Sequence, residues 1–136
     1  MNGLETEDFA TALRLEAQRE RDLPERLKFT RPFSYFSRGL YADLLEPYFN
    51  RFMEHQLLIA RYEDITERPS AVAEAVHRFL AVSPQPADAE GLGVINPSAR
   101  DVRGLEDDVR RELSARYIEP NQRLATMLGP SFPMWR

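Results

Sequence analysis

A short basic segment, residues 26–40, holds the residue types best suited to bind an anion. It contains four basic side chains and no acidic one, with Phe and Tyr residues interleaved among them. Arg31 and Arg38 could hold a planar anionic group, because a guanidinium pairs with its charge while aromatic rings stack on it. The alternative, which we favour, is that the rings pack into the core and the arginines stay solvated, since Arg stems often cover apolar surface.

A second candidate anion site lies in residues 83–104, which are rich in Pro, Gly, Asn and Asp and predict a long loop. Asn96, Ser98 and Arg100 lie there, shortly before a predicted helix, and could close over a phosphate or sulfate. An ordinary polar surface loop is the alternative. Loops of this length in small domains are often functional, so both interpretations stay open.

Glu63 and Asp64 are the candidate acid–base pair, because they follow a predicted strand. Acidic residues at such positions more often accept hydrogen bonds from backbone amides of the next turn. We favour this second role.

The sequence lacks the residues that several kinds of chemistry require. The chain has no cysteine, so disulfides, thiolate metal ligands and cysteine nucleophiles are excluded. His55 and His77 are the only histidines and lie 22 residues apart, without a ligand set around them, so we expect no metal site. Lys28 is the only lysine, and no glycine-rich phosphate loop surrounds it.

The elements that must position these residues are mostly helical by their apolar spacing. The best strand in the chain is the short apolar run from Gln56 to Tyr62. Its continuous apolarity suits a strand covered on both faces, which predicts an α/β layer arrangement. Helices are predicted at about 5–21, at 37–52 with a kink or break at Pro47, from a cap at Thr66 with Pro69 near its start, over 105–117, and from Pro120 to a stop at Gly129.

Length and composition favour one compact domain. The chain has 136 residues, of which 43% are hydrophobic and 29% charged, as is typical of a globular protein. The net charge of -4 argues against a nucleic-acid binder. No apolar run approaches the ~20 residues of a membrane span, and no signal peptide precedes the first helix.

An ordered set of motifs resembles the C-terminal part of sulfotransferases that use 3'-phosphoadenosine 5'-phosphosulfate (PAPS). The resemblance covers most of residues 37–136 and is strongest to the carbohydrate type, related to the heparan sulfate N-sulfotransferase domain and its bacterial relatives. One departure is Ala81, where those proteins have Gly. The motifs are S-R-G-x-Y at 37–41, Q-L-L-I at 56–59, Y-E-D at 62–64, F-L at 79–80, N-x-x-L at 121–124 and P-x-W at 133–135.

The resemblance implies a fold, a reaction and site residues. The fold would be the helix-rich portion of a P-loop-like α/β sulfotransferase, and the reaction sulfuryl transfer from PAPS to a hydroxyl or amine acceptor. Arg100 aligns with an arginine that contacts the cofactor. Ser98 stands near the place of the family's lysine and loses its charge, and Asn96 is a weaker correspondence. We assign Arg38 and Tyr41 to the acceptor site, for a small-molecule or carbohydrate acceptor.

The phosphosulfate-handling elements of the family are missing. The sequence has no K-x-G-T-T-like loop, and Arg31-Pro32-Phe33-Ser34 lies too late to be the R-x-x-S element that holds the 3'-phosphate. Residues 1–36 resemble the variable stretch that follows those elements. We therefore expect residues 1–136 to be one incomplete sulfotransferase-like domain, inactive alone and without an assigned catalytic residue, unless a separate N-terminal half or self-association completes it.

A non-catalytic helical interaction module is the alternative class of protein. The strand at 56–62 and the aromatic surface at 29–41 would then form a partner-binding face. Binding to a membrane surface through residues 26–38 is less favoured, because Pro32 interrupts any helix there. The absence of cysteine fits a cytoplasmic, bacterial-type relative better than a disulfide-bearing enzyme.

Overall fold

The computed structural model describes residues 5–83 and 105–134 of the chain. It divides into two compact units, one made of residues 1–50 and 104–136 and the other of residues 51–103. No helix in the described ranges is long and apolar enough to cross a membrane.

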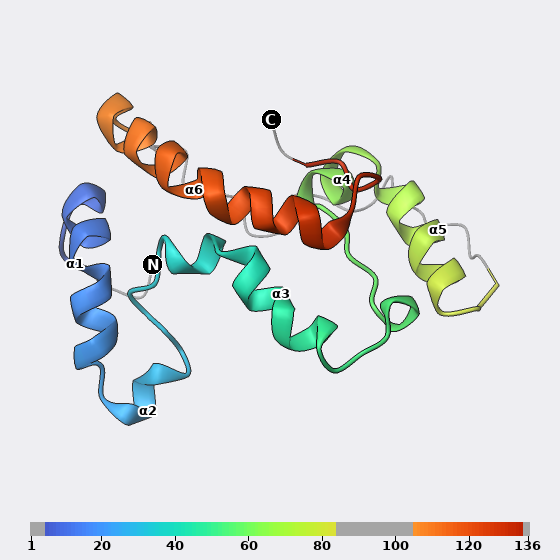
Figure 1. Ribbon diagram of the computed structural model, residues 1–136, viewed down its shortest axis with the longest axis horizontal. Helices are drawn as coiled ribbons and strands as arrows, with labels where there is room; N and C mark the ends of the chain where they lie inside the picture. Colours follow the sequence, from blue (N-terminus) through green and yellow to red (C-terminus); the bar gives the residue numbers. More distant parts are fainter. Residues whose placement is uncertain (1–4, 84–104, 135–136) are drawn as a thin grey trace. The chain divides into compact units, whose positions relative to one another are not determined.

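The first unit is built from helices. Its longest helix, α6, packs along α3 (Figure 1). An ion pair of 2.8 Å between Arg123 and Asp43 links the same two helices. The elements are α1 (Phe9–Asp22), α2 (Glu25–Lys28), the 3-10 turn η1 (Ser37–Gly39), α3 (Tyr41–Phe49) and α6 (Asp107–Leu128).

A small core joins these helices. Ala12 and Leu13 of α1, Ala42 of α3, and Val109 and Leu124 of α6 are all buried. Each comes from the inward face of its helix, so burying this surface is what drives the three helices together.

Two prolines of the described residues lie in the interior of helices. The sequence predicts a kink or break at Pro47 and a new helix at Pro120, but α3 contains Pro47 and α6 continues through Pro120. A proline removes one intrahelical hydrogen bond and crowds the preceding turn. The contact between α3 and α6 supplies packing on both helices that offsets this cost.

The second unit contains η2 (Glu54–Gln56), α4 (Tyr62–Glu67) and α5 (Pro69–Phe79). Pro69 opens α5, which suits a residue without an N–H group at that position. Thr66 is not the cap of this helix, because it lies within α4 and Arg68 occupies the cap position of α5. The Thr66 hydroxyl donates to the carbonyl of Glu63 at 2.9 Å.

The predicted strand at 56–62, and with it the α/β fold class, is wrong. Gln56 ends η2, Tyr62 begins α4, and no strand or sheet forms among the described residues. Leu57 has an extended backbone, at φ -119° and ψ 125°. A strand also needs a neighbour to accept and donate its backbone hydrogen bonds, and no described segment pairs with this one. Leu58 is 43% exposed, so the run is not covered on both faces.

Gly39 is required by its closeness to α6. A Cβ at this position would lie 2.8 Å from Cζ and 2.9 Å from Cε1 of Tyr117, and closer still to its hydroxyl oxygen. Real Cβ atoms do not approach other atoms so closely, and the Tyr117 hydroxyl is itself bound, donating to the carbonyl of Phe36 at 2.8 Å. The glycine therefore lets α6 approach η1.

We predict that Gly39→Ala destabilises the chain by about 1–3 kcal/mol, the usual cost of forcing an extra group into a packed contact. Urea unfolding followed by circular dichroism measures the loss. Tyr117→Leu removes the atoms that the new methyl group would strike, so the double variant should lose less than the sum of the single losses. Strictly additive losses would show that residues 39 and 117 do not meet.

Candidate functional site

The S-R-G-x-Y segment is fixed to α1 by one buried carboxylate. Glu16, only 5% exposed, accepts hydrogen bonds at 2.8 Å from the backbone N–H groups of Phe36 and Ser37. It also accepts one at 2.6 Å from the Ser37 hydroxyl. Three donors compensate the cost of burying this side chain, which would be severe without them.

The same segment is fixed to α6 through Tyr117. The hydroxyl donates to the Phe36 carbonyl, and the rings of Phe36 and Tyr117 lie 4.6 Å apart between centroids. The guanidinium of Arg116 stacks over the ring of Phe36, 3.9 Å from the ring centre. Burial, together with the charge of Glu16, raises the pKa of Tyr117, so the hydroxyl remains a donor at neutral pH.

A second carboxylate, Glu20, organises the basic segment. Its Oε1 accepts from Arg31 Nη2 at 3.0 Å and from the hydroxyl of Ser34. The Ser37 hydroxyl lies 3.1 Å from the same oxygen. Burial alone would raise the pKa of Glu20, but hydrogen bonds from Ser34, Arg31 and Ser37 outweigh it and hold the pKa below its ordinary value of 4.5.

A third carboxylate, that of Glu5, holds the segment before α1 through hydrogen bonds. Glu5 Oε2 accepts from Arg19 Nη1 at 2.6 Å and from the hydroxyl of Tyr35. The bond from Tyr35, with smaller contributions from the Glu7 amide and Arg19, lowers the pKa of Glu5 to about 2. Burial and the neighbouring Glu5 raise the pKa of Tyr35 to about 12.

The proposed anion-binding arginines of the basic segment are engaged within the chain. Arg31 pairs with Glu20, and Arg38 Nη2 donates to the carbonyls of Thr30 at 2.9 Å and Arg31 at 3.2 Å. In the described part of the chain, the guanidinium groups that stack on aromatic rings belong to two other arginines. They are Arg19, 4.8 Å from the Phe33 ring centre, and Arg116.

The predicted acceptor residues differ in their surroundings. Arg38 is exposed at the surface of η1, with its guanidinium held by two carbonyls. Tyr41, at the start of α3, is 47% exposed. The structure thus places both on one short, fixed segment. The predicted cofactor residues Asn96, Ser98 and Arg100 lie outside the described residues and stay predictions.

Asp64 forms ion pairs rather than the expected bonds to backbone amides. Arg61 donates two hydrogen bonds to Asp64, from Nε to Oδ2 at 3.0 Å and from Nη2 to Oδ1 at 2.8 Å. Arg68 also donates to Oδ1. These hydrogen bonds, Arg61 first, hold the pKa of Asp64 far below its ordinary value. Asp64 therefore carries no proton to donate at neutral pH and joins the entry of α4 to the entry of α5.

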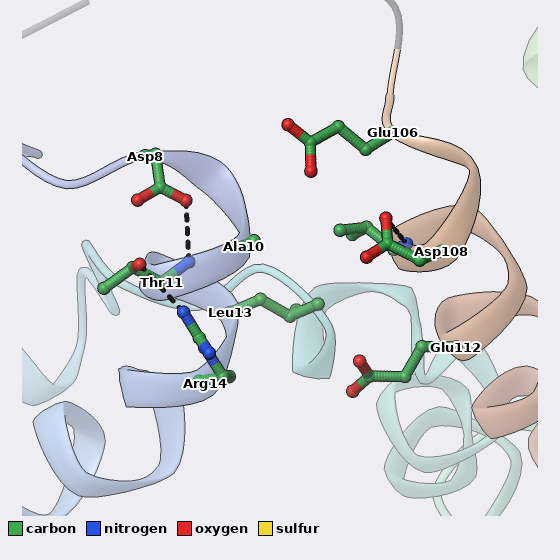
Figure 2. A pocket seen from close by; sticks show the side chains of 9 residues that line it. Asp8, Ala10, Thr11, Leu13, Arg14, Glu106, Asp108 and Glu112 are labelled. Atoms are coloured by element: carbon green, nitrogen blue, oxygen red, sulfur yellow. Dashed lines mark hydrogen bonds between the residues drawn. The ribbon is translucent and has the colours of Figure 1, made fainter.

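A groove of about 370 Å³ lies between the first turns of α1 and α6 (Figure 2). Asp8 and Asp108 use carboxylate oxygens locally, accepting from the amides of Thr11 at 3.0 Å and Val109 at 2.8 Å. Arg14 is the one basic side chain among the described lining residues, and it donates to the Thr11 hydroxyl at 3.1 Å. No group of three or more His, Cys, Asp or Glu side chains in the described residues is arranged to hold a metal ion.

Sequence reasoning missed Glu16 and Tyr117. The signal for Glu16 was its position on α1, since it follows the buried Ala12 and Leu13 by three or four residues and so lies on the inward face. No comparable signal marks the Tyr117 hydroxyl, whose acceptor lies 81 residues away in the sequence.

Comparison with known proteins adds no relative. No protein-family model, curated protein or solved structure matches the chain. The resemblance to sulfotransferases therefore rests on the sequence motifs.

We predict that the stabilising effect of Glu20 depends on pH. A carboxyl whose pKa is lower in the folded than in the unfolded state stabilises the fold above its unfolded pKa, and this stability is lost as pH falls through the folded value. Glu20→Gln should cost about 1–2 kcal/mol at pH 7, from weaker bonds to Arg31 and Ser34. The difference from wild type should shrink as pH falls below about 4.5.

Unfolding in urea between pH 7 and pH 3 measures this difference. Glu119→Gln is the matched control, because Glu119 is exposed on α6 outside the cluster, and its difference from wild type should stay small throughout. A cost of Glu20→Gln that does not change with pH would contradict the assigned role of the Glu20 charge.

Proposed function

We propose that this chain is the C-terminal portion of a PAPS-dependent sulfotransferase. Together with phosphosulfate-binding residues that are not in this sequence, it would transfer the sulfuryl group to a hydroxyl or amine of a small-molecule or carbohydrate acceptor. The observation that carries the proposal is the ordered set of motifs, from S-R-G-x-Y at residues 37–41 to P-x-W at residues 133–135.

The contacts of the S-R-G-x-Y segment support the proposal by separating its residues into two groups. Ser37 and Gly39 face inward, where one binds Glu16 and the other leaves room for Tyr117. Arg38 and Tyr41 lie at the surface. A motif whose small residues fix the backbone and whose large residues reach solvent is suited to present side chains to a substrate. We propose that Arg38 and Tyr41 contact the acceptor.

The chemistry of sulfuryl transfer determines which further residues the proposed enzyme would need. The acceptor oxygen or nitrogen attacks sulfur in line, the bond from sulfur to the phosphate oxygen breaks, and adenosine 3',5'-bisphosphate (PAP) leaves with the electron pair. A base takes the acceptor's proton, and cations stabilise the leaving phosphate. The only lysine, Lys28, is exposed and paired with Glu25 at 2.8 Å, so it does not form a phosphate loop. These donors must come from residues outside this sequence.

Within this chain, Arg100 is the proposed cofactor contact, with Ser98 and Asn96 beside it. An arginine can bind a phosphate through two parallel hydrogen bonds, whereas Ser98 offers one neutral donor where the family has a charge. We propose a cytoplasmic location, since a chain without cysteine needs no oxidising compartment.

A non-catalytic interaction module is the second candidate function, and the second unit favours it. None of its described residues is buried, although many are large and apolar. Exposed apolar surface of this extent is typical of a partner-binding face. The exposed side chains are Phe52, Met53, Leu58, Tyr62, Ile65, Val76, Phe79, Leu80 and Val82.

We predict that the isolated chain does not bind PAP at micromolar concentrations in isothermal titration. The 5' phosphate has no lysine-rich loop here to pair with its charge. Micromolar binding by the isolated chain would contradict this prediction.

Co-expression with the N-terminal half of a complete carbohydrate sulfotransferase should restore PAP binding. In that pair, Arg100→Ala should weaken PAP binding about tenfold, the loss expected for one charge-assisted contact. Arg103→Ala, three residues further along the sequence, is the control and should have little effect. A pair that assembles but binds no PAP would overturn the sulfotransferase proposal and favour the interaction module.

A further inference from the structure

One phenylalanine of the basic segment projects into solvent. Phe29 is 95% exposed, whereas every other large apolar side chain between residues 10 and 40, all of which the structure describes, is buried or half-buried. A single exposed apolar side chain is ordinary on a protein surface. Phe29 differs because the turn that carries it is fixed and because cationic side chains lie around it.

The turn that follows α2 is held against α1. Leu27 of α2 lines a groove formed with α1. The N–H groups of Thr30 and Arg31 both donate to the carbonyl of Leu27, at 3.1 Å and 3.2 Å. The guanidinium of Arg31 pairs with Glu20 of α1 at 3.0 Å. Phe29 lies between these anchors, so a fixed stretch of backbone displays its ring.

Three cationic side chains lie around the ring. Arg26 is exposed and precedes Phe29 by three residues on helical backbone, and residues at this spacing are neighbours on a helix surface. Lys28 directly precedes Phe29, and its side chain is 51% exposed. Arg38 reaches the turn from η1, because its Nη2 donates at 2.9 Å to the carbonyl of Thr30, the residue after Phe29. This acceptor is neutral, so it leaves the positive charge of Arg38 uncancelled.

The acidic residue of α2 neutralises little of this charge. Glu25 pairs with Lys28 at 2.8 Å, but its side chain is 88% exposed. An ion pair this exposed is weak, because water screens it and both side chains must be ordered to form it. The Lys28 ammonium is therefore available to another anion. Residues 26–40 hold four basic side chains and no acidic one, so the patch stays positive in a chain whose net charge is -4.

The composition of the patch favours a membrane surface over other anionic partners. A protein interface has a contiguous apolar centre, whereas residues 10–40 expose one ring. A nucleic-acid strand is bound by successive aromatic rings along a basic groove, and the net charge of the chain opposes it. An anionic bilayer fits what is present, because cations attract its headgroups while an apolar side chain enters the boundary between headgroups and acyl chains.

We propose that Arg26, Lys28, Phe29 and Arg38 form a peripheral contact with the surface of an anionic membrane, in which the Phe29 ring enters the boundary below the headgroups. The sequence argued against such a contact because Pro32 interrupts any helix over residues 26–38. The structure removes this objection, since the patch needs no long helix: α2 is a single turn, and Arg38 returns to it from η1. One ring and a few cations give reversible binding. The inference is independent of the proposed sulfotransferase function.

The test is co-flotation of the full chain with vesicles, made either of phosphatidylcholine alone or of phosphatidylcholine and phosphatidylserine in equal amounts. The chain should float with the anionic vesicles and stay in solution with the neutral ones. Raising sodium chloride from about 0.1 M to about 1 M shortens the Debye length from about 10 Å to about 3 Å, which should release the chain. Equal binding to both kinds of vesicle would overturn the proposal. Binding to neither would overturn it too and leave a protein partner as the occupant.

Phe29→Ser tests the role of the ring. It should lower the partition coefficient on anionic vesicles about fivefold or more, because the apolar contribution is lost. Since Phe29 is 95% exposed, the substitution removes no packing from the fold. Phe52→Ser is the matched control, the same change at another exposed phenylalanine, in the second unit, and should have little effect. Equal losses would show that exposed apolar surface in general binds the vesicles, and would overturn the proposal.

The double variant Arg26→Gln with Lys28→Gln tests the charge of the patch. It should lower the partition coefficient about tenfold or more, because two cations near the headgroups are lost. Arg110→Gln with Arg111→Gln is the control, since it removes the same charge from exposed positions on α6. Equal losses in the two double variants would show that only the net charge of the chain matters, and would overturn the proposal.

Two further measurements locate the ring and identify the anion. Phe29→Trp should shift its fluorescence to shorter wavelength on anionic vesicles and be quenched by lipids with brominated acyl chains, above the background that Trp135 gives in the wild-type chain. A tryptophan at position 29 that shows neither change would overturn the proposal. Single-stranded oligothymidylate at constant ionic strength should leave the chain on the vesicles. Displacement would assign the patch to a nucleic acid and overturn the proposal.

Discussion

The carboxylate of Glu16 binds the backbone of a segment twenty residues further along the chain, and the first unit is organised around that contact. The N–H groups of Phe36 and Ser37 point at this carboxylate, and the carbonyl of Phe36 points the other way, to the hydroxyl of Tyr117. Backbone polar groups that leave water must find partners, and here α1 provides one and α6 the other. The segment between them is thereby held on both sides.

This arrangement explains why the motif residues have the types they do. Ser37 needs a hydroxyl because it bridges Glu16 and Arg31, and Gly39 needs to lack a side chain because the Tyr117 ring lies against it. Neither requirement applies to Arg38 and Tyr41, which lie at the surface. A motif that holds its own backbone in this way can present two side chains to a ligand at a fixed spacing, which is the physical content of the proposed acceptor site.

Local patterns in the sequence predicted the elements better than the contacts between them. A helix was expected at about 5–21 and lies at Phe9–Asp22. The strand at 56–62 was wrong because apolar composition does not supply the neighbouring strand on which a strand depends. Pro120 was expected to begin a helix, but packing of α6 along α3 outweighs that local effect.

The candidate site shows the same difference between local patterns, which the sequence reveals, and contacts between elements, which it does not. The sequence named the S-R-G-x-Y segment as a candidate through its resemblance to a family motif, and the role of its exposed residues stays a prediction. Its supports could not, because they depend on groups that only the fold brings together, such as Tyr117 with Phe36. The charged pairs of the basic segment were missed for the same reason, since Glu20 lies on α1, outside the segment it neutralises.

Hydrogen exchange at the amides of Phe36 and Ser37 tests most directly whether Glu16 holds this segment. Both N–H groups are bound to Glu16, so they should exchange far more slowly than the amide of Phe29, a residue that is 95% exposed. In Glu16→Gln, protection at these two amides should fall, while amides in the middle of α5 keep theirs. Equally fast exchange at Phe29, Phe36 and Ser37 in the wild-type chain would contradict the account.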